Sequence, residues 1–313
     1  MTGPRGDRRY RVIRNVSAGT KGGIPTNACS SDELIDLLDR HRLGRDVIET
    51  ASPDEARRAT VRAVADGVDV VVAAGGDGTI GVIAGELLGT STALGVLPLG
   101  SVMNIARMLG LPRELEAAAG VLAAGYVTRI DVGEVDGEPF YEAASVGMNA
   151  AIFREAARFD EGDWLSIART IWVALRYRPA RMSVELDDEQ EVNTRALMVA
   201  VANGPYTGAG MTVAPDAQLD DGLFDVRVFR AFSKWELLRH LASIAFGRRR
   251  YAPHTSTHRA ARVRITSAHP LPCRADSQDL GVTPIELRIR PDELAVVVPH
   301  PREAVPSESP TPP

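Results

Sequence analysis

Residues 68–107 read VDVVVAAGGDGTIGVIAGELLGTSTALGVLPLGSVMNIAR, and the rest of the chain can be placed around them. The run Val68–Ala74 is apolar except for Asp69, which is typical of a strand buried on both faces. The turn Gly75–Thr79 (GGDGT) follows at once, and a helical pattern covers Ile80–Leu88. Strand, glycine-rich turn and helix in this order predict one βα unit of an open α/β sheet.

A second unit of the same kind comes next in the chain. Ala93–Leu97 is predicted to be a strand, Pro98–Ser101 (PLGS) a turn, and another helix is expected from near Val102. Because open α/β sheets bind ligands at the carboxyl ends of their strands, the two glycine turns are expected to face one crevice.

The GGDGT turn has the composition of a phosphate site. Its glycines allow positive φ and close approach of a ligand, and backbone N–H groups at a helix start can surround a phosphate. Asp77 would repel a bare phosphate, so it is expected to act through Mg²⁺ or on a hydroxyl group. The alternative is that the glycines only make tight turns, but two such turns at successive strand ends favour a ligand site.

The motifs GGDGT at 75–79 and LPLGS at 97–101 resemble the diacylglycerol kinase catalytic family. That family includes bacterial lipid kinases and sphingosine and ceramide kinases, and is distantly similar to NAD kinases and phosphofructokinases. The resemblance implies ATP as cofactor. The residues it assigns to the nucleotide phosphates are Gly75, Gly76, Asp77, Gly78, Thr79, Gly100 and Ser101.

Two earlier segments extend this implied nucleotide site. The family usually has Asn-Pro-x-Ala/Ser-Gly after its first strand, and here Asn15, Ala18 and Gly19 match while Val16 replaces the proline. Thr50 ends the next predicted strand, where the family often has a threonine near the nucleotide. A glycine-rich surface loop and an ordinary β-branched strand end are the plainer alternatives.

The alternation of strands and helices up to Arg107 predicts a doubly wound parallel sheet in an N-terminal domain, residues 1–125. After Gly125 the pattern becomes mostly β, with a hairpin turn at Asp136-Gly137. Residues 126–300 are therefore expected to form a mostly antiparallel β-sandwich, and the resemblance implies that this domain holds the lipid substrate. The Pro- and Ser-rich segment 301–313 is expected to be a disordered tail.

The second block of the resemblance is Asn203–Met211 (NGPYTGAGM), where the family reads Asn-Gly-x-x-x-Gly-Gly-Gly-Met. The block DDGLFDV that follows implies a Mg²⁺ site with Asp221 as its carboxylate and the backbone carbonyls of Gln218 and Leu223 as further ligands. Oxygen ligands of this kind suit Mg²⁺. An ordinary Asp-Gly turn between strands is the alternative.

The acids of the implied mechanism are Asp77, Asp131 and Asp276. Asp77 and Asp131 are expected to organise Mg²⁺ or the acceptor hydroxyl. Near the C-terminus the family has Asp-Gly-Glu, whose acids are linked with proton abstraction, but here the residues are Asp276-Ser277-Gln278. Because an amide is not basic, Gln278 cannot take a proton, and Asp276 is expected to be the remaining base.

Two helices are expected in the second half of the chain, over Phe153–Tyr177 and Ser233–Phe246. The second is amphipathic and is followed by Arg248–Tyr251, so it either packs in the core or lies on anionic lipid.

Composition limits the partners. The net charge of −5 gives no reason to expect nucleic acid, and two cysteines are too few for a disulfide framework. No signal peptide or transmembrane segment is evident, so a cytoplasmic enzyme is expected that reaches its lipid at the membrane surface and pairs as a homodimer through exposed strand edges.

The function implied is transfer of the ATP γ-phosphoryl group to a lipid hydroxyl such as that of diacylglycerol. The alternatives are a weakly active or non-catalytic lipid-binding protein and a soluble-substrate kinase related to NAD kinase.

Overall fold

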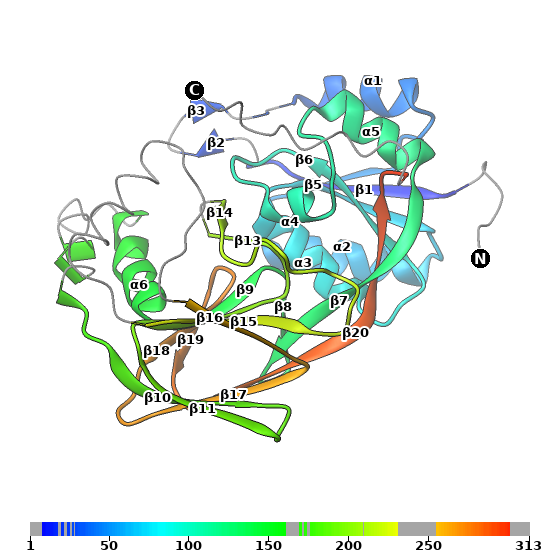
Figure 1. Ribbon diagram of the computed structural model, residues 1–313. Coiled ribbons are helices and arrows are strands. Elements are labelled where there is room, and N and C mark those ends of the chain that lie inside the picture. Colours follow the sequence, from blue (N-terminus) through cyan, green and yellow to red (C-terminus); the bar gives the residue numbers. More distant parts are fainter. Residues whose placement is uncertain are drawn as a thin grey trace, which may run out of the picture. The chain divides into compact units, whose positions relative to one another are not determined.

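The computed structural model describes residues 8–17, 20–21, 24–25, 27, 29–160, 169–170, 172–173, 176–208, 210–230 and 255–300. The chain divides into two compact units. The first unit contains Met1–Ile130 and Glu293–Pro313, and the second contains Asp131–Asp292. Figure 1 shows the chain coloured along the sequence, with its helices and strands labelled.

The first unit is a parallel sheet with helices on both faces, which confirms the predicted doubly wound arrangement (Figure 1). Its strands lie in the order β4, β1, β5, β6, followed by the end of β20, and their pairings are parallel. The strands are β1 (Tyr10–Asn15), β4 (Val47–Thr50), β5 (Val70–Gly75), β6 (Ala93–Pro98) and β20 (Ile285–Val298), with a separate short pair β2 (Thr20–Lys21) and β3 (Ile24–Pro25).

The helices of this unit begin where the sequence supplies capping groups. Ser30 Oγ accepts a hydrogen bond from the Glu33 N–H and the Glu33 carboxylate accepts one from the Ser30 N–H, so α1 starts with a capping box. At the start of α2, Ser52 Oγ accepts from the Glu55 N–H, and Pro53 lies in the first turn. The helices are α1 (Ser31–Arg40), α2 (Pro53–Ala65), α3 (Asp77–Leu87), α4 (Asn104–Met108) and α5 (Leu115–Ala124).

Every residue of β5 is buried, as the apolar run predicted. Val70, Val72 and Ala74 pack in one cluster with Leu34 of α1 and Leu122 of α5. Since side chains alternate along a strand, Val71 and Ala73 face the opposite layer. Burial on both faces fixes the position of the turn that follows β5.

The second unit is built from antiparallel strands in two sheets, which confirms the predicted β-sandwich. One sheet has the order β16, β15, β12, β9, β18, β19, and the other has β11, β10, β17 and the start of β20. The strands are β9 (Ala143–Gly147), β10 (Ala180–Leu186), β11 (Gln190–Ala196), β12 (Met198–Ala202), β15 (Phe224–Phe229), β16 (Thr255–Ala260), β17 (Arg262–Ser267), β18 (Pro272–Ala275) and β19 (Gln278–Val282).

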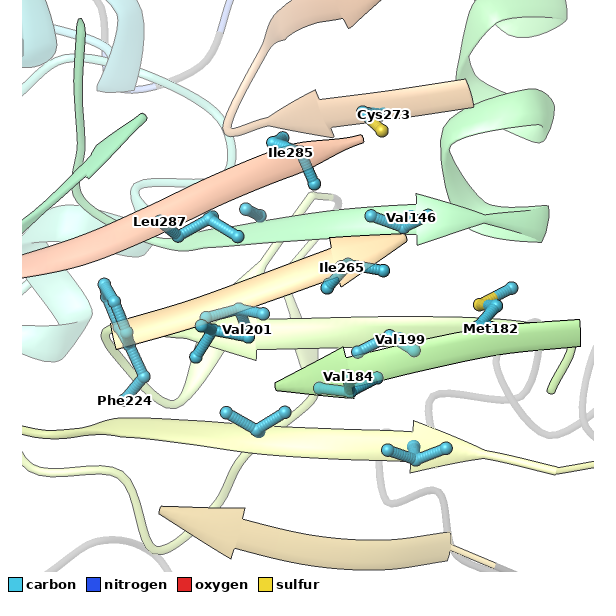
Figure 2. Close-up of a cluster of buried hydrophobic side chains, with 14 of the residues drawn as sticks. Val146, Met182, Val184, Val199, Val201, Phe224, Ile265, Cys273, Ile285 and Leu287 are labelled. Carbon is cyan, nitrogen blue, oxygen red and sulfur yellow. The ribbon is translucent and has the colours of Figure 1, made fainter. Parts of the chain in front are cut away.

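One hydrophobic cluster joins the two sheets of this unit. Val184 and Ile265 come from one sheet, and Val201 and Phe224 from the other, and Figure 2 shows them in a single layer. This layer is the core of the second unit, formed where the two sheets face each other.

Shorter elements complete the second unit. The hairpin predicted at Asp136-Gly137 is present between β7 (Tyr126–Val135) and β8 (Glu138–Phe140), and both turn residues have positive φ. Helix α6 (Met148–Asp160) covers the start of the longer helix expected there, and β13 (Tyr206–Thr207) pairs with β14 (Met211–Thr212).

The division between the units differs from the expected boundary at residue 125. It falls after Ile130, and the chain returns to the first unit at Glu293. The reason is strand β20, in which Ile285–Arg288 pairs antiparallel with β17 while Val296 pairs in parallel with Leu94 of β6.

Three expectations concern residues outside the described ranges: the helix Ser233–Phe246 with the arginines after it, most of the later part of the helix Phe153–Tyr177, and the tail 301–313. In the described part of the chain, no helix is both long and apolar enough to span a membrane.

Candidate functional site

The two glycine turns pack directly against each other. Gly75 pairs in register with Pro98, and the Leu99 N–H donates to the Gly75 carbonyl at 3.2 Å. A Cβ added at Gly100 would lie 2.8 Å from the Gly76 Cα, closer than real Cβ atoms come. Glycine is therefore required at Gly100 by backbone packing, and the two turns form one packed surface.

The end of β1 joins the same surface. Asn15 Nδ2 donates to Thr79 Oγ1 at 3.0 Å. A Cβ at Gly75 would lie 2.6 Å from the Thr79 Cβ, so the threonine packs over the bare backbone of the turn. Three of the residues assigned to the nucleotide are thus brought together by tertiary structure.

Asp77 is the first residue of α3 and connects the two turns. Its carboxylate oxygens accept hydrogen bonds from the backbone N–H groups of Asn104 and Ile105, both at 3.0 Å. These N–H groups open α4, which follows Met103 in the left-handed conformation. The acid thus caps a neighbouring helix, where negative charge is favourable.

The start of α3 has room for a ligand. Its N-cap is Gly76, which has no side chain to bond the first N–H groups, and a Cβ at Gly78 would meet nothing within 4 Å. Exposed N–H groups at a helix start fit phosphate oxygens. The donors therefore suit the phosphates of a nucleotide.

The other residues assigned to the nucleotide differ in their surroundings. Thr50 is buried and its hydroxyl donates to the Arg14 carbonyl at 3.2 Å, so it ties β4 to β1. The Ser101 carbonyl accepts a bond from Arg113 at 3.0 Å. Ala18 and Gly19 lie outside the described residues.

In the second unit, Asp131 is only 1% exposed and its carboxylate is used by backbone donors. Oδ2 accepts from the Gly222 N–H at 2.7 Å and Oδ1 from the Asp292 N–H at 2.9 Å. Its own N–H donates to the Leu219 carbonyl at 2.6 Å. Asp131 therefore anchors the loop that carries the predicted metal ligands.

Asp276 has a similar position in the β18–β19 turn. Its carboxylate accepts hydrogen bonds from three consecutive backbone N–H groups, those of Tyr141, Glu142 and Ala143, at 2.8, 2.9 and 3.2 Å. The Asp276 N–H donates in return to the Ala143 carbonyl at 3.1 Å. The residue predicted to be the base thus holds a neighbouring segment in place.

That segment contains an acid which the sequence analysis did not select. Glu142 is 6% exposed, and its Oε2 accepts from the Gly208 N–H at 3.1 Å. The signal available in the sequence was a single charge inside the otherwise uncharged run 140–146 (FYEAASV). Its burial makes Glu142 a candidate site residue, because a buried carboxylate is rarely placed without a partner or a function.

A half-buried guanidinium lies in the same region. Arg274 stacks over the Phe153 ring at 3.9 Å and donates two hydrogen bonds to the Asp276 carbonyl. Burial lowers the pKa of Arg274, while the charges of Asp276 and Glu142 act in the opposite direction. Positive charge is thereby held beside the two acids.

Asn203, the first residue of the Asn203–Met211 block, links Asp131 to the segment that Asp276 holds. Its Nδ2 donates to the carbonyls of Asp131 and Tyr141, both at 3.1 Å. Its Oδ1 is buried and has no partner within the described part of the chain. The block therefore organises the acidic region, which its match to the family pattern did not specify.

The predicted Mg²⁺ ligands show a mixed fit to a cation. Asp221 Oδ1 accepts from the Leu223 N–H at 3.0 Å, and the other oxygen pairs with Arg259. The described residues contain no group of three or more His, Cys, Asp or Glu side chains that could hold a metal. One carboxylate with carbonyl oxygens remains compatible with Mg²⁺, but the ion would compete with Arg259.

A second carboxylate, Asp225, also lies near Arg259, the guanidinium with which a cation at Asp221 would compete. Burial raises the pKa of Asp225, while Arg259 and Arg227 act to lower it. Arg259 Nε lies 4.0 Å from Asp225 Oδ2, so the same guanidinium serves two carboxylates.

Gln278 is exposed at the start of β19, where it pairs with Ala275. The next residue, Asp279, forms a two-pronged ion pair with Arg154 at 2.6 and 2.7 Å. The hydrogen bond from Arg154 lowers the pKa of Asp279.

Two family models match successive parts of the chain. The diacylglycerol kinase catalytic domain model matches residues 9–135, and the YegS C-terminal NAD kinase beta sandwich-like domain model matches residues 143–298. A diacylglycerol kinase of Mycobacterium tuberculosis is 29% identical over 274 residues, covering 83% of this chain and 87% of the relative.

Two further matches cover most of the chain. A diacylglycerol kinase of Bacillus subtilis is 26% identical, covering 80% of this chain and 84% of its own. The crystal structure of a diacylglycerol kinase from Bacillus anthracis shares the fold, with a TM-score of 0.71 at 18% identity over 94% of this chain and 98% of that chain. With both of its parts matched in order, the chain belongs to the diacylglycerol kinase catalytic-domain family of lipid kinases.

Proposed function

We propose that this protein transfers the γ-phosphoryl group of ATP to the hydroxyl group of a membrane lipid, and that diacylglycerol is the acceptor to test first. The observation that supports the proposal most is the surface formed by the two packed glycine turns, with Asp77 between them. Membership of the lipid kinase family supports the choice of acceptor.

On the nucleotide side, the backbone N–H groups at the start of α3 bind phosphate oxygens, and Thr79, oriented by Asn15, adds a hydroxyl donor. Phosphoryl transfer depends mainly on positioning and on neutralising charge. Mg²⁺ bound with ATP would supply that neutralisation. Asp221 and the carbonyls of Gln218 and Leu223 are the residues we propose for holding a cation.

On the acceptor side, a carboxylate takes the proton of the lipid hydroxyl. Asp131 and Asp276 accept hydrogen bonds from backbone N–H groups. Glu142 is a buried carboxylate on the segment that Asp276 holds, and its Oε2 accepts from the Gly208 N–H. We therefore add Glu142 to Asp131 and Asp276 as a proton acceptor. Asp276 then acts on the reaction by fixing the Glu142 backbone.

A weakly active lipid-binding protein is the second candidate. The observation in its favour is the exposed Gln278 where the family has a glutamate, next to an Asp276 occupied by three N–H groups. A general base raises the rate of such a reaction by about 10²–10⁴-fold. A weaker base would therefore lower the rate, while positioning of the reactants would still allow slow phosphoryl transfer.

The test is incubation of the purified full-length protein with ATP labelled on the γ-phosphate and with extracted lipids. We expect an organic-soluble phosphorylated product, and we expect Asp77→Asn to reduce its formation by about 100-fold or more, as loss of a positioned charge does. Label that appears only in water-soluble NADP or sugar phosphate would contradict a lipid acceptor. Undiminished turnover by Asp77→Asn would remove Asp77 from the mechanism.

The same proposal places the protein in the cytoplasm, in contact with the membrane surface. Fractionation of cells and the oligomeric state in solution would test that placement and the expected homodimer.

A further inference from the structure

The outer face of strands β10 and β11 carries three rows of cross-strand pairs. Arg181 lies opposite Arg195, Ser183 opposite Asn193, and Glu185 opposite Glu191. The residues between them, such as Met182 and Val184, point into the core. Because side chains alternate along a strand, the three rows share the face away from that core.

The side chains of the middle row, Ser183 and Asn193, bond to the acidic row and not to the arginine row. Ser183 Oγ and Asn193 Nδ2 both donate to Glu191 Oε1, at 2.7 and 3.0 Å. The hydrogen bond from Ser183 lowers the pKa of Glu191, so its charge is kept there. Both side chains of the middle row thus direct donor groups to Glu191, and neither brings a negative charge to the arginine row.

The arginine row is left without a counter-charge. In the described residues, neither Arg181 nor Arg195 has an ion pair or a side-chain hydrogen bond. On the β17 side of Arg181 the neighbouring residue is Ala268, whose N–H donates to the Arg181 carbonyl, and its side chain carries no charge. Like charges directly opposite each other in a sheet are destabilising, so this row stores a repulsion that an anion would relieve.

Other arginines of the same face are paired. Arg262 Nη1 lies 2.7 Å from Asp188 Oδ2, and Arg264 lies 3.8 Å from Glu185. Arg181 and Arg195 are therefore as exposed as Arg262 and Arg264 but, among the described residues, have no ion-pair partner.

The row borders a hollow with a volume of about 510 Å³. Besides the two arginines, its wall includes Thr266, which lies opposite Ser183 on β17 and whose hydroxyl has no hydrogen-bond partner among the described residues. A hollow of this volume is within the range of small-molecule sites. It therefore has room for a phosphate group together with a fragment of the molecule that carries it.

We propose that this hollow binds a phosphate-bearing anion, either free or as a lipid headgroup. Arg181 and Arg195 each donate guanidinium N–H groups to phosphate oxygens, and Thr266 donates its hydroxyl. The planar guanidinium fork fits phosphate geometry, and two positive charges match a phosphomonoester dianion. The proposal does not depend on the proposed kinase activity, because it concerns binding alone.

The experiment measures binding of inorganic phosphate by the full chain, using calorimetry, with a chloride buffer as reference. Arg181→Gln and Arg195→Gln are expected to weaken binding about tenfold or more each, as loss of a hydrogen bond to a charged group does. Arg262→Gln is the matched control, since it removes the same charge from the same face and is expected to leave binding unchanged.

Thermal unfolding gives a second readout. Phosphate is expected to raise the Tm of the wild-type protein and of Arg262→Gln, but not that of Arg181→Gln or Arg195→Gln. Without phosphate, each of the latter variants is expected to unfold at a temperature at or above that of the wild type, because the repulsion has been removed.

Vesicles distinguish the two sources of phosphate. Flotation with phosphatidylcholine vesicles, with and without phosphatidic acid, should show Arg181-dependent binding only to the anionic ones if the source is a headgroup, and free phosphate should compete. Binding of phosphate without vesicle binding assigns the site to a soluble molecule. An equal loss of binding in Arg262→Gln, or no saturable phosphate binding by the wild type, would overturn the site.

Discussion

The two glycine turns of the first unit and the acidic segment of the second unit, which is Tyr141–Ala143 together with Asp276, both contain residues that match the family pattern. They differ in what the structure requires of those residues. At Gly100 the requirement is the absence of a side chain, because the Gly76 backbone lies where a Cβ would be. At Asp276 the requirement is a carboxylate, but three backbone N–H groups already use it. A glycine motif thus specifies geometry directly, whereas a matching acid can serve either structure or chemistry.

The largest effect on activity is expected from a variant that removes the chemistry of an acid but keeps its structural hydrogen bond. We expect Glu142→Gln to lower kcat by about 10²–10⁴-fold while keeping the fold, because an amide oxygen still accepts the Gly208 N–H but takes no proton. The acidic limb of the pH–rate profile should disappear with it. Kinetics with ATP and diacylglycerol at several pH values would measure both.

Asp276→Asn is the partner variant. Its amide cannot accept all three N–H groups, and each unsatisfied buried group costs about 1–3 kcal/mol, so Tm should fall. If Asp276→Asn instead abolishes activity at an unchanged Tm, while Glu142→Gln keeps the wild-type pH profile, Asp276 is the base and Glu142 is structural. Absence of lipid phosphorylation by the wild type would instead contradict the proposed function itself.

A smaller effect is expected in the first unit. Gly100→Ala should destabilise the protein by about 1–3 kcal/mol, the usual range for overpacking, because the Gly76 backbone cannot move aside as a flexible side chain can. Gly78→Ala is the control, since an added Cβ there meets nothing within 4 Å. Urea unfolding of both variants would check this, and equal stabilities would show that the turns are not tightly packed.

The smallest effect concerns the ion pair next to the acidic segment. The pKa of Asp279 is lowered in the folded state, so the pair stabilises the fold above the unfolded pKa of about 3.9, and this is lost as pH falls through the folded value. Both side chains are largely exposed, so Arg154→Gln should cost no more than about 1 kcal/mol at neutral pH.

Unfolding of Arg154→Gln and wild type at neutral and acidic pH would measure that difference. It should shrink toward zero in acid. A cost that persists at low pH would mean that Arg154 acts through its hydrogen bond to the Gly281 carbonyl at 2.9 Å and not through charge.

Much of the fold was predictable because its signals are local. The buried run of β5, the two glycine turns and the Asp136-Gly137 hairpin each follow from a few adjacent residues. The course of β20 was not predictable, because its pairing with β17 and then with β6 joins segments that are distant in the sequence.

The candidate site divides in the same way. The sequence by itself determined which residues lie at the ends of β5 and β6, since strand, glycine and helix preferences are properties of neighbouring residues. Only the tertiary structure decided that Asp77 caps α4, that Asp131 and Asp276 hold backbone segments, and that Glu142 lies buried on the segment held by Asp276. The physical reason is that the hydrogen-bond partners of a carboxylate come from residues far along the chain, and these partners determine whether its lone pairs are available for chemistry.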